Sequence, residues 1–322
     1  MAILYLPSNQ CNAEFALIKK RKNLILVRML QRNLDASLLE LVRRTSTELP
    51  ADVKRVISQS IQREQDGSIA KNALTIIEKN IQLAKERSLP LCQDTGSCLF
   101  YVDCPVGFDQ ITFAEAARNA VKTATQKGYL RQNSVDSLNG KNSGTNLGLG
   151  MPVFHFHQHS SSEVSVRMML KGGGSENMGH QYALPIVKLG ANRDLEGCRR
   201  VILDAVLDTQ GKGCGPGILG ICIGGDRATG FEHSKEQLLR KLDDINPIPE
   251  LAQLEATIIE QANQMGIGPM GFGGKTTLLG AKIGVLNRLP ACYFVSISYM
   301  CWAFRRQGVS LGNEGEIKNW LY

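Results

Sequence analysis

The sequence predicts an α/β fold, in which a mixed-sheet domain follows a helical N-terminal portion. Segments with helical periodicity and segments typical of strands alternate from about residue 92 to the C-terminus, whereas residues 38–84 show helical periodicity alone. Neither internal repeats nor low-complexity linkers interrupt this order. With 322 residues, of which 43% are hydrophobic and 21% charged, the chain is long enough to bury a large core.

The helical portion consists of three segments in which apolar residues recur every three or four positions. They are Leu38, Leu41 and Val42; then Val53, Val56, Ile57 and Ile61 after the break at Pro50; then Ile69, Ala73, Ile77, Ile81 and Ala84. This spacing places each set on one face of a helix. Pro90 ends the region, and we expect a turn over residues 92–97 and a short strand over residues 99–102.

The central part predicts a helix, a pair of strands and a loop. The helix is expected over residues 113–127, because Gly128 is a typical helix stop. Residues 152–158 and 163–170 alternate between apolar and polar side chains and are joined by a serine-rich turn, which predicts a β-hairpin. The glycine-rich loop 171–177 follows, and such loops let backbone amides approach a ligand.

The remaining sequence predicts three further helices and three further strands. The helices are expected over residues 195–207, 232–242 and 249–264, and the strands over residues 218–223, 278–285 and 293–299. The first of these strands follows the glycine-rich segment 213–217, and the last ends near Cys301. We therefore expect one α/β domain over residues 35–322.

The net charge of +7 is concentrated at the N-terminus. Residues 1–33 contain six lysines and arginines against Glu14 alone, so they carry +5 and the other 289 residues carry +2. This nearly neutral body excludes a nucleic-acid-binding face. No window has the roughly 18 uninterrupted apolar residues of a transmembrane helix, so no membrane association is expected.

We expect residues 1–34 to be a basic N-terminal extension that need not be structured. It is a surface arm, an organelle-targeting segment, or an artefact of a start assigned upstream of Met29. The extension lacks the clean apolar stretch and small-residue cleavage site of a secretory signal. A cytoplasmic location is therefore expected.

The nine cysteines indicate reduced thiols, because their number is odd and no secretory signal precedes them. No CxxC pair is present, so any metal site must combine distant parts of the chain. Cys92, Cys214 and Cys301 each lie beside a turn and could face a shared cleft. Cys198 and Cys222 lie in apolar segments, where a thiol acts as a small core residue.

Two motifs resemble nucleotide sites but lack a required feature. Residues 266–271 match GxGxxG, yet they follow a predicted helix and contain Pro269, whereas a dinucleotide site joins a strand to a helix. Residues 274–276 match the end of a P-loop, but Pro269 replaces the glycine that should come five positions earlier. We therefore expect neither nucleotide site.

Two further groups have a structural and a functional interpretation. His155, His157 and His159 share one strand face, which we interpret as polar surface and not as a metal site because no carboxylate or cysteine accompanies them in the sequence. Arg305 and Arg306 are typical of a solvated surface. Their position directly after Cys301 favours contact with an anionic ligand.

Five motifs occur in order along the chain. They are LCQDTG at 91–96, KGGGSEN at 171–177, GCGPG at 213–217 with IGG at 223–225, GIGPMGFGGKTT at 266–277, and SYMCWAFRR at 298–306. Together they resemble the alpha subunit, or N-terminal domain, of class I iron–sulfur fumarate hydratases. Tartrate dehydratase alpha subunits share this framework. The resemblance covers residues 35–322.

By motif position, the resemblance implies that Cys92, Cys214 and Cys301 hold a four-iron, four-sulfur cluster. Three protein ligands leave one iron open, so that it can act as a Lewis acid on a substrate oxygen instead of transferring electrons. The implied reaction is the reversible hydration of fumarate to (S)-malate. Fumarate is preferred over tartrate because the sequences after the glycine loop and around Cys301 look more like those of fumarases.

The resemblance also implies roles for residues near these thiols. Gln93 and Asp94 would act as catalytic residues that contact the substrate or the reacting water. Arg131 would clamp a substrate carboxylate, and Gly173 would offer its amide to a carboxylate.

Lys275 and Arg305 would contribute charge to the substrate cleft. In the family, the general base and several carboxylate-binding residues lie in a C-terminal domain or beta subunit, which this chain lacks. The cluster site is therefore expected at an interface with that missing part, and the chain should be inactive until a beta subunit completes an α2β2 assembly.

Three alternatives to an iron–sulfur fumarate hydratase remain. One is an L(+)-tartrate dehydratase alpha subunit. Another is a metal-free, non-catalytic scaffold of the same fold. The last is a nucleotide-binding protein that would use the GKT sequence at residues 274–276.

Overall fold

The computed structural model describes residues 33–322. Residues 33–47 are helical and are followed by α2 (Ala51–Arg63) and α3 (Ile69–Arg87), which confirms the three predicted N-terminal helices. Ser68 caps α3, because its Oγ accepts a hydrogen bond from Lys71 N at 3.1 Å. Apart from its last two residues, the expected basic extension 1–34 lies outside the described residues.

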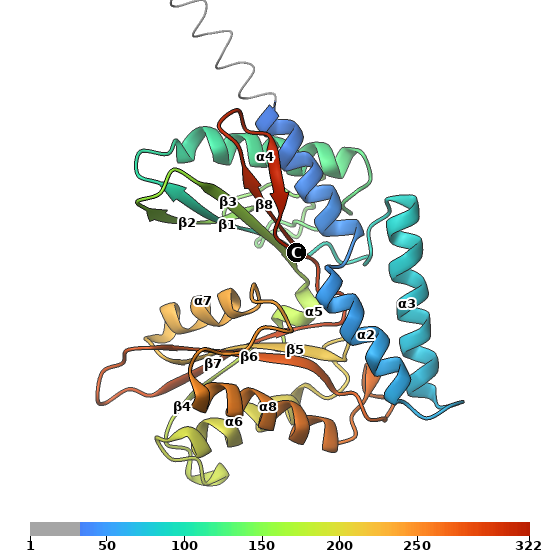
Figure 1. Ribbon diagram of the computed structural model, residues 1–322, viewed down its shortest axis with the longest axis vertical. Helices are drawn as coiled ribbons and strands as arrows, with labels where there is room; N and C mark the ends of the chain where they lie inside the picture. Colours follow the sequence, from blue (N-terminus) through green and yellow to red (C-terminus); the bar gives the residue numbers. More distant parts are fainter. Residues whose placement is uncertain (1–32) are drawn as a thin grey trace, which may run out of the picture.

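Two mixed sheets form the body of the molecule (Figure 1). The five-stranded sheet contains, in spatial order, β2 (Val153–His159), β1 (Ser97–Pro105), β3 (Val164–Lys171), β8 (Arg306–Leu311) and β9 (Ile317–Trp320). The four-stranded sheet contains β4 (His180–Ala183), β7 (Phe294–Met300), β5 (Gly217–Gly224) and β6 (Leu278–Leu286). In each sheet one pair is parallel, β1 with β2 and β5 with β6. The α/β class is confirmed, with two mixed sheets in place of one.

The pairing of the predicted β-hairpin is wrong. Both of its strands form, as β2 and β3, but β1 lies between them, parallel to β2 and antiparallel to β3. Alternation of apolar and polar residues reports which face of a strand is buried and not which strand lies beside it. A strand next to β1 satisfies the same pattern as a strand in a hairpin.

Several elements differ from the predicted boundaries. The helix expected over residues 232–242 is α7 (Arg227–Gln237), which begins earlier because Asp226 caps it and accepts hydrogen bonds from the N–H groups of Ala228 and Thr229. The elements that were not predicted are β4, β8, β9, the single-turn helix α5 (Gly173–Glu176) and the short 3-10 helices η1 (Val187–Leu189) and η2 (Pro269–Gly271).

Helices cover both sheets. α4 (Gln110–Gln126) and the helical residues 33–47 pack on the five-stranded sheet, where Leu38, Phe100 and Phe113 are buried. α6 (Leu195–Thr209) and α8 (Pro249–Gln264) cover one face of the four-stranded sheet, and α7 lies on its other face, between the two sheets (Figure 1). Among the helices of residues 33–322, none combines the length and the apolar character needed to cross a bilayer.

One hydrophobic cluster joins the two sheets. It contains Ile57 from α2 and Leu74 from α3, together with Met169 from β3 and Ile218 and Met300 from the four-stranded sheet. Because these side chains come from both sheets and both helices, the cluster fixes how the parts meet.

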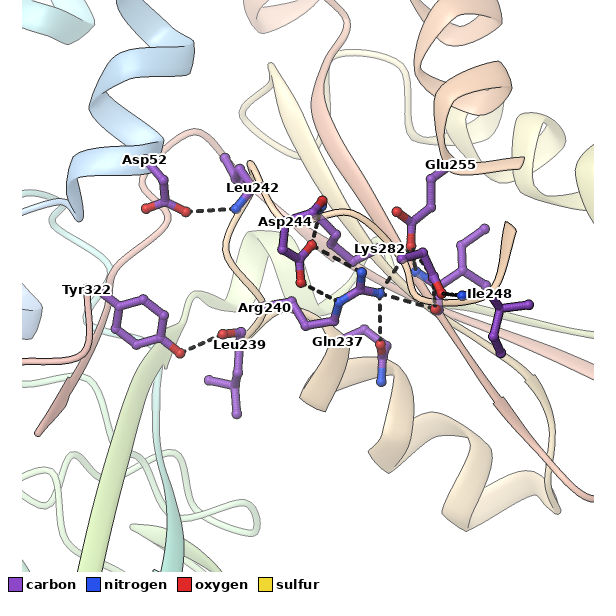
Figure 2. Close-up of polar contacts among 12 residues, drawn as sticks. Asp52, Gln237, Leu239, Arg240, Leu242, Asp244, Ile248, Glu255, Lys282 and Tyr322 are labelled. Atoms are coloured by element: carbon purple, nitrogen blue, oxygen red, sulfur yellow. Dashed lines mark hydrogen bonds and ion pairs between the residues drawn. The ribbon is translucent and has the colours of Figure 1, made fainter. Parts of the chain in front are cut away.

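A polar network holds the segment 238–246 that follows α7 (Figure 2). Asp52 on α2 accepts a hydrogen bond from Leu242 N at 2.8 Å, and Tyr322 near the C-terminus donates its hydroxyl to Leu239 O at 2.5 Å. Three ion pairs complete the network: Arg240 with Asp244, Arg240 with Glu255, and Lys282 with Asp244. The segment thereby ties both sheets to α2 and α8.

Candidate active site

The five motif segments meet around α5, which lies between the two sheets (Figure 1). Four hydrogen bonds link them in series: Gly173 N to Asp94 Oδ2 (2.7 Å), Cys301 N to Ser175 Oγ (3.2 Å), Trp302 N to Cys214 O (3.4 Å) and Met270 N to Gly215 O (3.0 Å). Each bond joins two segments that are distant in the chain. The fold therefore assembles one site from all five motifs.

The turn over residues 92–97 packs directly against the end of β3. Gly96 has a φ of +75°, and a Cβ atom at this position would collide with the carbonyl group of Lys171. Only glycine fits so close an approach in this conformation. The contact places the turn beside the glycine-rich segment that carries α5.

Cys92, Cys214 and Cys301 lie on three of the motif segments that these hydrogen bonds join. Cys301 is buried, Cys92 is half-buried against the same hydrophobic cluster, and Cys214 is exposed. Burial raises the pKa of the Cys214 thiol, and the negative charges of Cys301, Cys92 and Asp94 raise it further. The hydrogen bonds between their segments place the three cysteines in one region of the fold.

The thiols of this neighbourhood are free. None of the eight cysteines within residues 33–322 forms a disulfide. In that same part of the chain, no three His, Cys, Asp or Glu side chains are close enough to hold a single metal ion.

The Asp94 carboxylate is held at both oxygens. Gly173 N donates to Oδ2 at 2.7 Å, and Asn133 Nδ2 donates to Oδ1 at 2.7 Å. Gly173 was predicted to offer its amide to a carboxylate, and the carboxylate that it meets in this structure is that of Asp94. A carboxylate has about four lone-pair sites, so two of them stay open to other partners.

Arg131 is anchored through its backbone. Its N–H donates to Thr95 Oγ1 at 2.9 Å, and its carbonyl accepts hydrogen bonds from Thr95 Oγ1 and Asn146 Nδ2, both at 2.8 Å. The side chain itself is exposed. Among residues 33–322, no side chain or carbonyl pairs with its guanidinium, which extends from a fixed backbone position next to the Asp94 turn.

Gln93 and Lys275 occupy different parts of the site. Gln93 is exposed beside Asp94. Lys275 is also exposed, and its N–H donates to both carboxylate oxygens of Glu64, the C-cap of α2, at 3.0 Å. Glu64 thus fixes the 266–277 loop against α2, and within residues 33–322 no hydrogen bond joins Lys275 to Asp94.

Arg305 is buried behind the glycine-rich segment, with only 1% of its surface exposed. Its Nε and Nη1 atoms are buried and have no hydrogen-bond partner within residues 33–322. A Cβ atom built on Gly172 would lie 3.6 Å from its Nη2 and 2.9 Å from Asp94 Oδ2, so the guanidinium and the carboxylate flank the same glycine. Any role of Arg305 in the site is therefore through its charge.

A second buried cation lies close to Cys301. Lys171 Nζ donates to the carbonyl of Tyr299 at 2.7 Å and pairs with Glu176 at 3.0 Å. Burial lowers the pKa of Lys171, and the neighbouring carboxylate of Glu176 opposes this effect. Glu176 also pairs with Lys235 of α7. The buried side of the site is thus lined by positive charge.

The three histidines of β2 lie away from this site. His155 Nδ1 contacts Glu232 of α7 at 2.7 Å, and His157 lies 3.6 Å from both Asp103 and Glu236. Carboxylates do accompany the histidines in space, although none does in the sequence. The polar face of β2 thereby serves as a contact between the five-stranded sheet and α7.

Arg306, like Arg305, was expected on a solvated surface, and the structure buries both residues. Arg306 is fully buried, its Nη2 pairs with Asp52 at 2.6 Å, and its guanidinium lies over the rings of Phe304 and Tyr322. These contacts make it a structural residue of the junction between β8 and α2.

Asn133, Ser175 and Glu64 contribute to the site but were not predicted. Ser175 belongs to the motif KGGGSEN, and Asn133 lies two residues after Arg131, so both are close in sequence to residues that were predicted. A motif shows which residue types occur together, whereas their partners depend on contacts across the fold. Glu64 lies outside every motif, and only the structure identifies it.

The fumarate hydratase (Fumerase) family model matches residues 35–310 of the chain. A protein of Geobacillus stearothermophilus assigned as a fumarate hydratase class I is 52% identical over 290 residues, which are 89% of this chain and 56% of that protein. The chain therefore spans little more than half the length of this relative.

Two tartrate dehydratase relatives are covered more fully. A protein of Methanocaldococcus jannaschii assigned as an L(+)-tartrate dehydratase subunit alpha is 34% identical over 83% of this chain and 94% of its own length. The L(+)-tartrate dehydratase subunit alpha of Escherichia coli K12 is 28% identical over 81% of this chain and 85% of its own length. The chain thus belongs to the class I fumarate hydratase and tartrate dehydratase alpha family.

Proposed function

We propose that this chain is the alpha part of an iron–sulfur fumarate hydratase, which adds water reversibly across the double bond of fumarate to give (S)-malate. The observation that carries the proposal is the set of hydrogen bonds that joins the segments of Cys92, Cys214 and Cys301 in one region of the fold. Membership of the fumarate hydratase family supports the same reaction class.

The residues around the three thiols fit a four-iron, four-sulfur cluster. Three free thiols could hold three of the four irons of such a cluster, which would then be anionic. Arg305, whose Nε and Nη1 have no hydrogen-bond partner within residues 33–322, and the buried Lys171 supply positive charge on the protein side. When bound, such a cluster keeps one iron without a protein ligand, and that iron supplies Lewis-acid chemistry toward a substrate oxygen.

The chain's own groups then bind and orient the substrate. The exposed guanidinium of Arg131 suits a bidentate contact with one carboxylate of a dicarboxylate. Asp94, with two lone-pair sites open, is placed to hold or move a proton, and Gln93 beside it can bind the substrate or water. Lys275 and Arg305 add positive charge that favours a dianionic substrate.

We further propose that a beta subunit completes the site in an α2β2 assembly. The 56% coverage of the Geobacillus protein supports this, because that relative has a further part which this chain does not match. The names of the tartrate dehydratase relatives also describe an alpha subunit. Free thiols throughout residues 33–322 favour a reducing compartment, and we place the enzyme in the cytoplasm.

Substrate choice provides the test of this proposal. The chain is reconstituted anaerobically with iron and sulfide, and then mixed with the separately expressed part of the Geobacillus protein that this chain does not cover. Fumarate and L(+)-tartrate are supplied in parallel, and loss of fumarate and formation of oxaloacetate are followed.

We expect hydration of fumarate by the mixture and not by either part alone. Turnover of tartrate alone would reassign the chain to the tartrate dehydratases, as its coverage of the two alpha subunits would allow. Full activity of this chain by itself would remove the need for a beta subunit. Mixtures that take up no iron and act on neither substrate would support the metal-free, non-catalytic scaffold.

A further inference from the structure

The Asp94 carboxylate is fixed by two donors from different elements. One is the N–H of Gly173, the first residue of α5, and the other is the side-chain amide of Asn133, 39 residues away in the chain. Both distances are 2.7 Å. The group of Asn133 that faces the carboxylate is its NH2 group, which donates to Oδ1.

Asn133 is itself held in place. Its N–H donates to Asn146 Oδ1 at 2.7 Å, and the Nδ2 of the same Asn146 donates to Arg131 O at 2.8 Å. Asn146 is 5% exposed, and Thr95, the neighbour of Asp94, also bonds the backbone of Arg131. The amide that meets Asp94 therefore comes from a braced segment and not from a free loop.

We propose that Asn133 is a positioning residue for the hydration reaction, which it serves by holding the Asp94 carboxylate in a single orientation. The inference rests on the proposed function. Without the Asn133 amide, only the Gly173 N–H would hold the carboxylate, which could then turn about its Cβ–Cγ bond. Displacement of a reacting group by about 1 Å can cost on the order of 100-fold in rate.

The neutral amide also suits this position chemically. It fills one lone-pair site of Oδ1 and adds no charge, so the carboxylate keeps open sites for a substrate or water. A lysine or arginine here would compete with the substrate's carboxylates for the same neighbourhood by adding a second cation next to Arg131. An aspartate would place two carboxylates in contact.

The first test uses the chain without its cofactor and needs no activity. Urea unfolding midpoints are compared for wild type, Asn133→Ala, Asp94→Ala and the double variant, in a double-mutant cycle. We expect Asn133→Ala to lower the midpoint in wild type and to change it much less in the Asp94→Ala background. Equal effects in both backgrounds would overturn the proposal.

The second test uses the reconstituted assembly and a matched control. Asn142 lies exposed in the same loop, and its side chain bonds Gln132 O and Gly144 N but not Asp94, so Asn142→Ala is expected to keep wild-type activity. Asn133→Ala should lower kcat by about 10- to 100-fold while KM changes by less than about threefold. Asn133→Gln, which keeps the amide, should recover part of the loss.

The outcomes separate this inference from the proposed function. A kcat for Asn133→Ala within twofold of wild type, or a loss confined to KM, would overturn the positioning role. If the wild-type assembly hydrates no fumarate, the proposed function fails, and the unfolding cycle alone then decides whether Asn133 holds Asp94.

Discussion

At the scale of single residues, the site depends on positions where a backbone comes unusually close to its neighbour. Gly96 combines a left-handed φ with contact to the Lys171 carbonyl, whereas Gly67 between α2 and α3 has nearly the same φ, +76°, and no atom within 4 Å of the place that a Cβ atom would occupy. Comparing substitutions at Gly96 and Gly67 therefore separates the free-energy cost of backbone strain from that of a steric collision.

We predict that Gly96→Ala destabilises the protein more than Gly67→Ala. The strain of a left-handed residue costs about 1–2 kcal/mol at either position, and at Gly96 the collision must also push the turn away from β3. Urea unfolding of the two variants measures the difference. Equal losses would contradict the close approach of the turn to Lys171.

The sequence motifs predicted which residues belong to the candidate site, but not which side chains those residues contact. The cysteines were predicted to share a cleft because each lies beside a turn, and hydrogen bonds do join the segments that carry them. That Asn133 meets Asp94, or that Arg305 is buried and not on a cleft wall, depends on side chains from different segments meeting in space. A single sequence contains no record of such pairs.

At the scale of elements, helix periodicity was a good guide and strand pairing was not. The N-terminal helices follow from apolar spacing, which depends on local geometry alone. The neighbour of β2 depends on β1, which precedes it by some 50 residues, so the hairpin prediction failed. Strands β8 and β9 were missed because the segment after Cys301 was interpreted as surface.

Glu236, a carboxylate of α7 that faces β2, predicts a dependence of stability on pH. A hydrogen bond from His233 lowers the pKa of Glu236 below its ordinary value of 4.5, against the effect of burial. A lowered pKa means that the folded state favours the charged carboxylate. Its stabilising effect is therefore complete above the unfolded pKa and is lost as the pH falls through the folded value.

We expect the stability advantage of wild type over Glu236→Gln to shrink as the pH falls from about 6 to 3. Glu115→Gln is the control, because Glu115 is exposed on α4. Urea unfolding at a series of pH values tests this. An advantage that stays constant over this range would show that Glu236 gains nothing from its charge in the folded state.

At the scale of the whole molecule, buried charges hold the two sheets to α2. Arg306, the first residue of β8, pairs with Asp52 of α2 at 2.6 Å, and Asp52 also accepts the Leu242 N–H drawn in Figure 2. Removing one partner of a buried pair leaves the other charge uncompensated, which is more costly than losing an exposed pair.

Arg306→Met is therefore predicted to cost about 3–5 kcal/mol of unfolding free energy. The control is Arg55→Met, because Arg55 and Asp243 form an exposed pair at the same 2.6 Å, and its loss should cost less than about 1 kcal/mol. Adding Asp52→Asn to Arg306→Met should recover part of the loss. Similar costs for the two arginines would contradict the buried junction.

We have proposed that three cysteines from distant segments hold one iron–sulfur cluster. The most direct measurement is iron and acid-labile sulfide per chain after anaerobic reconstitution, in wild type, in Cys92→Ala, Cys214→Ala and Cys301→Ala, and in Cys292→Ala as the control thiol outside the site. We predict about four irons in wild type and in the control, and loss of the cluster in each of the other three variants. A full complement of iron in any of those three variants, or none in wild type with its beta partner present, would contradict the claim.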